Sequence, residues 1–146
     1  MNQYYHYQPN YSQYGHLRNQ TLRNLNNSQA LFTAQEGFTR GNMFSDIYSK
    51  YKNYQPQPVK ANNEQEQLFL NMAENEFAAH DLNIYLDLHP QDGNALDLFN
   101  QYRVKANQAM MEYESKYGPL TTNSNELTES PFLWSTQAFP WTTGGM

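Results

Sequence analysis

The sequence predicts an all-α protein: an antiparallel helical hairpin with a disordered or extended N-terminal segment and an aromatic C-terminal strap. Two stretches of about 24 residues, or ~36 Å at 1.5 Å per residue, place apolar side chains at steps of three and four. A turn at residues 90–92 separates them, and Gly118-Pro119 ends the second. Matched lengths and a short turn imply that the two helices lie antiparallel within residues 63–118.

The first helix is expected to start near residues 63–67 and to end by His89. The ring of Pro90 removes a backbone donor and disfavours the helical conformation at the preceding residue. The apolar residues of this helix form two stripes, and a single partner helix can cover only one of them. We therefore expect another segment to cover the second stripe. The first stripe holds Leu68, Met72, Ala79, Leu82 and Leu86, and the second holds Phe69, Ala73, Phe77, Ile84 and Leu88.

The second helix is expected over residues 93–117. The Asp92 carboxylate suits an N-cap, because it accepts hydrogen bonds from free backbone N–H groups at the positive end of the helix dipole. Lys116 complements the other end, and Gly118 can take the left-handed conformation that ends a helix. One apolar stripe runs along the helix through Ala95, Phe99, Tyr102, Ala106, Ala109, Met110, Tyr113 and Tyr117.

Residues 1–30 are rich in Tyr, Asn and Gln and lack helical or strand periodicity, so we expect them to be disordered. Two interpretations of their tyrosines stay open: a plain low-complexity tail, or an adhesive or oxidatively cross-linkable one. Across the chain, 18 Asn, 14 Gln and 12 Tyr favour association between molecules over simple solvation.

Residues 31–54 form a short segment that is too apolar for an ordinary linker, with Phe38 and Phe44 among its large side chains. Gly37 and Gly41 are expected to break regular structure there. The segment should dock either on its own hairpin or on another protein. Residues 55–62, with two prolines, are the predicted linker.

Residues 119–146 comprise a polar loop and an aromatic ending that includes Trp134, Pro140 and Trp141. Large rigid aromatic side chains beside prolines are typical of buried anchors and of interface hot spots. The ending is therefore either a strap over the uncovered stripe of the first helix or a motif that binds a partner.

Composition excludes several classes of chemistry. The chain has no cysteine, so thiol catalysis, disulfides and zinc–thiolate sites are absent. It shows no phosphate loop or nucleophile motif, and we expect neither an enzyme nor a cofactor. Four polar residues share one helix face and could be imagined as metal ligands, but a solvated row is the simpler interpretation. They are Glu76, His80, Asn83 and Asp87.

Charge and hydropathy bound the partners. A net charge of −5, without a basic cluster interleaved with aromatic residues, argues against nucleic-acid binding. No stretch approaches the ~20 apolar residues of a membrane span, and the N-terminus lacks a secretory leader pattern. We therefore expect synthesis in a cytoplasmic space, and protein partners.

Several segments resemble a known family. The chain reads Leu82-Asn83-Ile84-Tyr85-Leu86-Asp87-Leu88-His89-Pro90, then Asp92 and Ala95-Leu96, and later Tyr113-Glu114-Ser115-Lys116-Tyr117-Gly118-Pro119-Leu120. Here it resembles the CotJB family of bacterial endospore coat proteins, over roughly residues 65–141. Trp134 and Phe139-Pro140-Trp141 are similar to that family's Trp- and Pro-containing tail. Residues 37–54 are similar, more weakly, to the motif of the companion CotJA family.

The resemblance implies a non-enzymatic component of the spore coat, made in the mother-cell cytoplasm, that assembles with other coat proteins and a manganese catalase-like companion. Because the second stripe is left uncovered, the chain is also expected either to form homo-oligomers or to need a partner. Two alternatives stay open: a peptide-binding adaptor, whose turn is similar to those of tetratricopeptide-type repeats, and an accessory subunit of a redox enzyme. The expected interaction or structural residues are Phe38, Phe44, Tyr85, Leu86, Asp87, His89, Pro90, Asp92, Tyr113, Tyr117, Gly118, Pro119, Trp134, Pro140 and Trp141.

Overall fold

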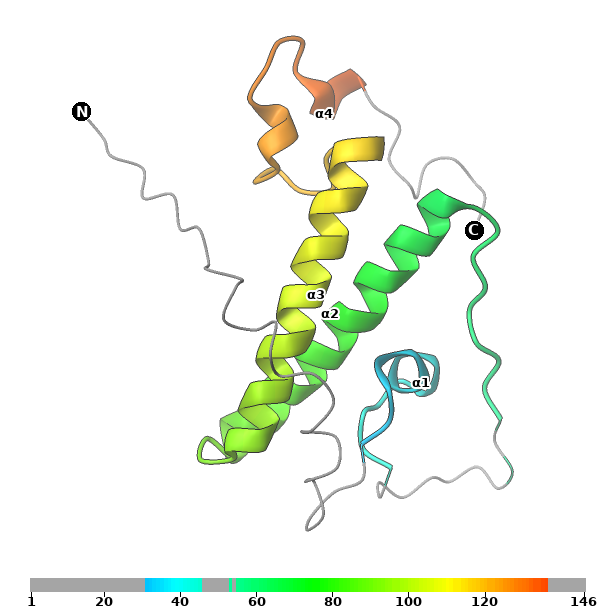
Figure 1. The fold of residues 1–146 in the computed structure, drawn as a ribbon, viewed down its shortest axis with the longest axis vertical. Coiled ribbons are helices and arrows are strands. Elements are labelled where there is room, and N and C mark those ends of the chain that lie inside the picture. Colours follow the sequence, from blue (N-terminus) through cyan, green and yellow to red (C-terminus); the bar gives the residue numbers. More distant parts are fainter. Residues whose placement is uncertain (1–30, 46–52, 54, 137–146) are drawn as a thin grey trace, which may run out of the picture.

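The computed structural model describes residues 31–45, 53 and 55–136. Two long helices, α2 (Glu64–Leu88) and α3 (Gly93–Tyr117), run antiparallel and pack along their length (Figure 1). A short helix, α1 (Ala34–Arg40), packs against α2, and the 3₁₀ helix η3 (Asn125–Leu127) and α4 (Leu133–Thr136) follow α3. The described residues contain no strand, only an isolated bridge between Leu31 and Phe44. The predicted all-α hairpin is confirmed.

Side-chain caps form at the starts of both long helices, and the predicted Asp92 cap is one of them. The Asn63 side chain accepts a hydrogen bond from the Glu66 N–H at the start of α2, and the Asp92 carboxylate accepts one from Ala95 at the start of α3. The backbone N–H of Gly118 donates to the Glu114 carbonyl. The expectation that Gly118 is left-handed is wrong, because its φ of 98° is combined with a ψ of 177°. This extended, positive-φ conformation also favours glycine, since a Cβ would be strained there.

The expectation that Gly37 breaks regular structure is also wrong, because Gly37 lies inside α1. A capping box starts this helix: the Thr33 hydroxyl accepts from the Glu36 N–H, and the Glu36 carboxylate accepts from Thr33. Gly41 ends α1 in the left-handed conformation, with φ 76°. A strong local cap thus overrides the low helix propensity of one internal glycine.

The core lies where α1 and its following turn meet the turn half of the hairpin. It is built from the buried side chains of Met43, Phe44, Ala78, Leu82, Ala95 and Leu98. Both long helices therefore contribute, and so does the segment before them. Sequence periodicity located Leu82 and Ala95 but not Ala78 or Leu98.

The expectations for residues 1–30, 46–52 and 54, and for Pro140 and Trp141, lie outside the described residues. Within the described residues, no helix is long and apolar enough to cross a membrane.

Leu82→Ala should destabilise the protein by about 2–5 kcal/mol, because Leu82 is fully buried and its loss leaves a cavity in the core. Ile84→Ala, two residues along the same helix at a side chain that is 51% exposed, is the control and should cost much less. Urea denaturation followed by circular dichroism measures both. Equal costs would contradict the assignment of the core.

Candidate interaction surfaces

The first surface is the contact between α2 and residues 31–45, which we call the arm. Met43 is completely buried, and its backbone N–H donates to the Asp81 carboxylate at 2.7 Å. The Phe38 ring meets Phe77 edge-on, with centroids 5.9 Å apart. Of the two alternatives for this segment, the structure places its described part on its own hairpin.

The arm is closed by its own hydrogen bonds. The Asn42 side chain donates to the Phe44 carbonyl at 2.8 Å and accepts from the Phe44 N–H at 2.6 Å. The Phe32 N–H donates to the Met43 carbonyl at 2.8 Å, and the Asn42 N–H donates to the Gly37 carbonyl at 2.9 Å. The Arg40 guanidinium lies over the Phe32 ring, 4.7 Å from its centroid. The arm therefore presents a preformed apolar plug, made by the side chains of Met43, Phe44 and Phe38, to α2. Hydrogen bonds within the arm itself already pair several of its backbone groups.

The second surface is the turn end of the hairpin. The Asp92 carboxylate caps α3 and also accepts a hydrogen bond from the Tyr85 hydroxyl at 3.1 Å. The Tyr85 ring lies 5.2 Å from Phe44 and 4.3 Å from His89, centroid to centroid. Burial, aided by the Asp92 carboxylate, raises the pKa of Tyr85. Tyr85 thus ties the arm, the end of α2 and the cap of α3 together.

The other predicted residues at the turn end have smaller structural roles. Leu86 is half-buried beside the core, whereas Asp87, His89 and Pro90 are exposed. The backbone N–H of His89 donates to the Tyr85 carbonyl, so His89 ends α2 as expected for a helix-end residue. The four residues of the polar row, Glu76, His80, Asn83 and Asp87, are all exposed.

The third surface is the open end of the hairpin, where α2 begins and α3 ends. Lys116 reaches Glu64 at 2.8 Å and Glu112 at 3.0 Å. Hydrogen bonding to Lys116 lowers the pKa of Glu64, and bonding to Glu64 and Glu112 raises the pKa of Lys116. Tyr113, only 2% exposed, accepts from the Gln65 side chain at 2.9 Å. The Tyr117 hydroxyl donates to Glu64 at 3.3 Å, completing a polar clasp between the helices.

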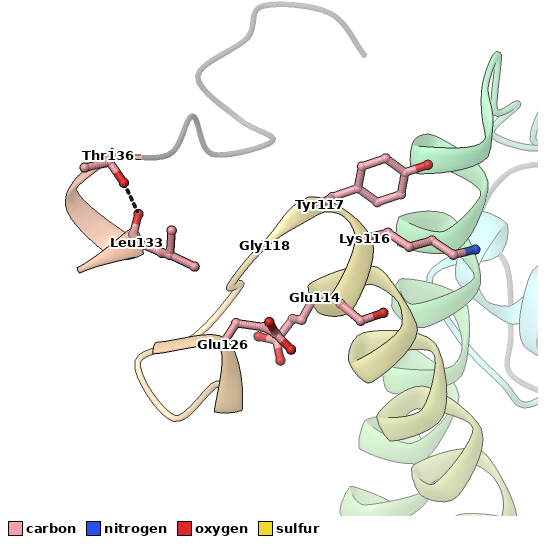
Figure 2. Close-up of a pocket in the computed structure, with 8 residues that line it drawn as sticks. Glu114, Lys116, Tyr117, Gly118, Glu126, Leu133 and Thr136 are labelled. Carbon is pink, nitrogen blue, oxygen red and sulfur yellow. Dashed lines mark hydrogen bonds between the residues drawn. The ribbon is translucent and has the colours of Figure 1, made fainter. Parts of the chain in front are cut away.

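Past the clasp, Gly118-Pro119 turns the chain back over the end of α3. The buried Glu114 carboxylate accepts the Leu120 backbone N–H at 2.8 Å, which fixes this reversal. An open pocket of about 400 Å³ lies beside it, between the last turn of α3 and α4 (Figure 2). Its lining includes Glu114, Lys116, Tyr117, Gly118, Glu126, Leu133 and Thr136.

The described part of the C-terminal strap lies at this open end. Trp134 is half-buried in α4, and α4 contacts η3. Two residues of the second stripe, Ile84 and Leu88, are 51% and 80% exposed at the opposite end of the hairpin. They lie seven and eleven residues after Phe77, and therefore on the same side of α2 as Phe77 but closer to the turn. We call these two residues the Ile84–Leu88 strip.

No group of three or more His, Cys, Asp or Glu side chains within the described residues is arranged to hold a metal ion. What the arrangement offers is packing surface, in the form of a preformed apolar plug, an aromatic turn and an exposed apolar strip. The class of protein that these features define is a small helical hairpin braced by a docked N-terminal arm.

A family model described as "CotJB protein" matches residues 66–142, which is more than half of the chain. The chain therefore belongs to the CotJB family, a family of spore coat proteins. No curated protein and no solved structure matches this chain. The family match starts in the first turn of α2, so it includes the hairpin and excludes the arm.

Sequence reasoning missed two residues of the hairpin that hold the arm: Asp81 as the hydrogen-bond acceptor of Met43, and Leu98 in the same buried cluster. Leu98 follows Ala95 by three residues, so helical spacing could have found it. No comparable signal marks Asp81, because the N–H group whose hydrogen bond it accepts belongs to Met43, 38 residues away in the sequence.

Gly37→Ala should loosen the arm, because an added Cβ would collide with the sulfur of the fully buried Met43. We expect a loss of about 1–3 kcal/mol in unfolding free energy, typical of overpacking a filled core. Gly93→Ala is the matched control, since a Cβ there meets nothing within 4 Å and alanine favours helix. Thermal denaturation of the two variants compares them, and an equally stable Gly37→Ala protein would contradict the close fit.

Glu64→Gln should flatten the acid limb of the stability profile. The pKa of Glu64 is lowered in the folded protein, so its stabilising contribution is present above the unfolded pKa of about 4.3 and is lost as pH falls through the folded pKa. The difference between wild type and Glu64→Gln in urea midpoint should therefore shrink between about pH 6 and pH 3. In a Lys116→Met background most of this pH-dependent difference should vanish. A difference that is constant with pH would contradict the ion pair.

Proposed function

We propose that this spore coat protein is a non-enzymatic structural component that works by protein–protein association, with a manganese catalase-like coat protein as its companion. The observation that carries the association is the Ile84–Leu88 strip, an i,i+4 apolar pair that remains exposed although the arm covers Phe77 on the same face of α2. A helix face with anchors at this spacing suits docking into an apolar groove of another subunit. Synthesis in the mother-cell cytoplasm is part of the same proposal.

The surroundings of the strip support a protein partner. Asp87 lies beside the strip and is exposed, so a polar side chain borders the apolar pair. Tyr85, next to Ile84 in the sequence, is held in place by its ring contact with Phe44 and its hydrogen bond to Asp92. Apolar anchors on a rigid base lose little conformational entropy on binding. An accessory role toward a redox enzyme is compatible with this surface, because such a role also acts through association.

Leu88→Asp should leave the fold intact and reduce incorporation into spores. Leu88 is 80% exposed, so we expect a stability change within about 0.5 kcal/mol, whereas loss of an interface anchor worth about 1 kcal/mol lowers occupancy roughly fivefold. Asn83→Asp is the matched control, because it places the same charge on an exposed face of α2 away from the strip. Quantitative blotting of purified, detergent-washed spores gives the readout.

Co-purification from sporulating cells tests the companion. The tagged wild-type protein should recover a manganese catalase-like protein, and Leu88→Asp should recover less of it. Normal spore incorporation of Leu88→Asp would show that the Ile84–Leu88 strip is not the docking surface. Absence of the wild-type protein from washed spores would contradict the structural role.

A further inference from the structure

We infer that the arm is an exchangeable ligand, and that the hairpin groove which holds it also accepts the arm of a second copy of this chain. The groove is formed by Phe77, Ala78, Asp81, Leu82, Tyr85 and Leu98. The inference deepens the proposed function, on which it rests, by naming one contact through which copies join.

The first support is that the arm is structurally self-contained. The capping box of α1, the left-handed Gly41, and the Asn42 bonds to Phe44 all lie within residues 31–45. The hydrogen bond from Met43 to Asp81 is the polar contact identified between arm and hairpin, and the remaining attachment is apolar and aromatic. Such a plug keeps its conformation whichever copy of the groove it enters, so exchange sacrifices few internal contacts.

The second support is the length and exposure of the connection. Twenty residue steps join Phe44 to Glu64, a reach of up to about 70 Å. The same connection in one chain spans only the part of α2 from Glu64 to Tyr85, about 32 Å of helix. Residues 57–60 are exposed, including Val59 at 54%, so moving this stretch costs little buried surface. The slack therefore permits the arm to reach a neighbouring hairpin.

The third support is the boundary of the family match. Residues 66–142 form the part shared with the family, whereas the arm, which fills the groove with the fully buried Met43, lies before it. The hairpin without its arm exposes a groove lined by Phe77, Leu82 and Leu98, with the Asp81 carboxylate as an acceptor. An apolar groove of this kind is stabilised by any chain that supplies the plug, and a second copy supplies the same one.

Mixing two full-length variants tests the exchange. In Met43→Asp the arm cannot seat and the groove is vacant, whereas in Phe77→Asp the groove is damaged and the arm is intact. Each variant alone should be monomeric in light scattering, and a mixture should form a one-to-one complex, because the arm of the second fills the groove of the first. The doubly substituted Met43→Asp/Phe77→Asp chain, mixed with Met43→Asp, is the control and should form none.

A fluorescent peptide of residues 31–45 provides the second measurement. It should bind full-length Met43→Asp, and the same peptide carrying the Met43→Asp change should bind at least about 30-fold more weakly, as expected from losing a buried Met. If Met43→Asp has lost helical circular dichroism, the wild-type peptide should restore it.

The outcomes separate the two proposals. No complex in the mixture and no peptide binding or restoration would overturn the exchangeable arm. If the wild-type chain is still incorporated into spores, the proposed structural function stands without the exchangeable arm. If the variants form the complex but the protein is absent from spores, the exchangeable arm stands and the structural function is overturned.

Discussion

A two-helix hairpin can bury only one stripe of each helix, and most of this structure follows from that limit. α2 carries apolar residues on two sides, and α3 covers the side that includes Met72, Ala79 and Leu82. The other side needs a third layer, which the arm supplies over Phe77 and Ala78 through Met43 and Phe38. The cluster around Met43 forms where all three segments meet, whereas Leu70, Met72, Ala106, Ala109 and Tyr113 are buried along the two long helices. The burial of Met43 couples the arm to the hairpin.

The sequence was sufficient for the hairpin because its signals are local. Pro90, Asp92 and Gly118-Pro119 fix the turn and the ends of α3 through backbone chemistry that involves only neighbouring residues. The arm was harder to predict, because Gly37 has a poor helix propensity and its value lies in a contact with Met43 that only the folded chain creates. The partnership of Met43 and Asp81 likewise depends on a long-range approach that periodicity does not encode. The sequence thus predicted that the arm is apolar enough to dock, but not which residues of α2 and α3 it contacts.

The two ends of the hairpin are held by different kinds of interaction. At the open end, Glu64 and Lys116 form an exposed ion pair, which water and salt weaken, so the buried ring of Tyr113 and its contact with Phe69 hold the helices there more firmly. At the turn end, Tyr85 binds the Asp92 carboxylate and stacks near Phe44 and His89. The Ile84–Leu88 strip lies at this turn end, beside the network of Tyr85.

Under the proposed function, this placement would link the arm to association with other molecules. The arm and the strip occupy successive parts of one α2 face, so the same face is filled from within the chain near Phe77 and left open near Leu88. A partner that docks on the strip would lie next to Tyr85, which follows Ile84 in the sequence and whose ring packs against Phe44 of the arm. Seating of the arm would then enlarge the surface offered to that partner, and binding would in turn hold the arm in place, because each event stabilises the arrangement that the other requires. In a coat built from many copies, this reciprocity would favour assembly of chains whose arms are seated.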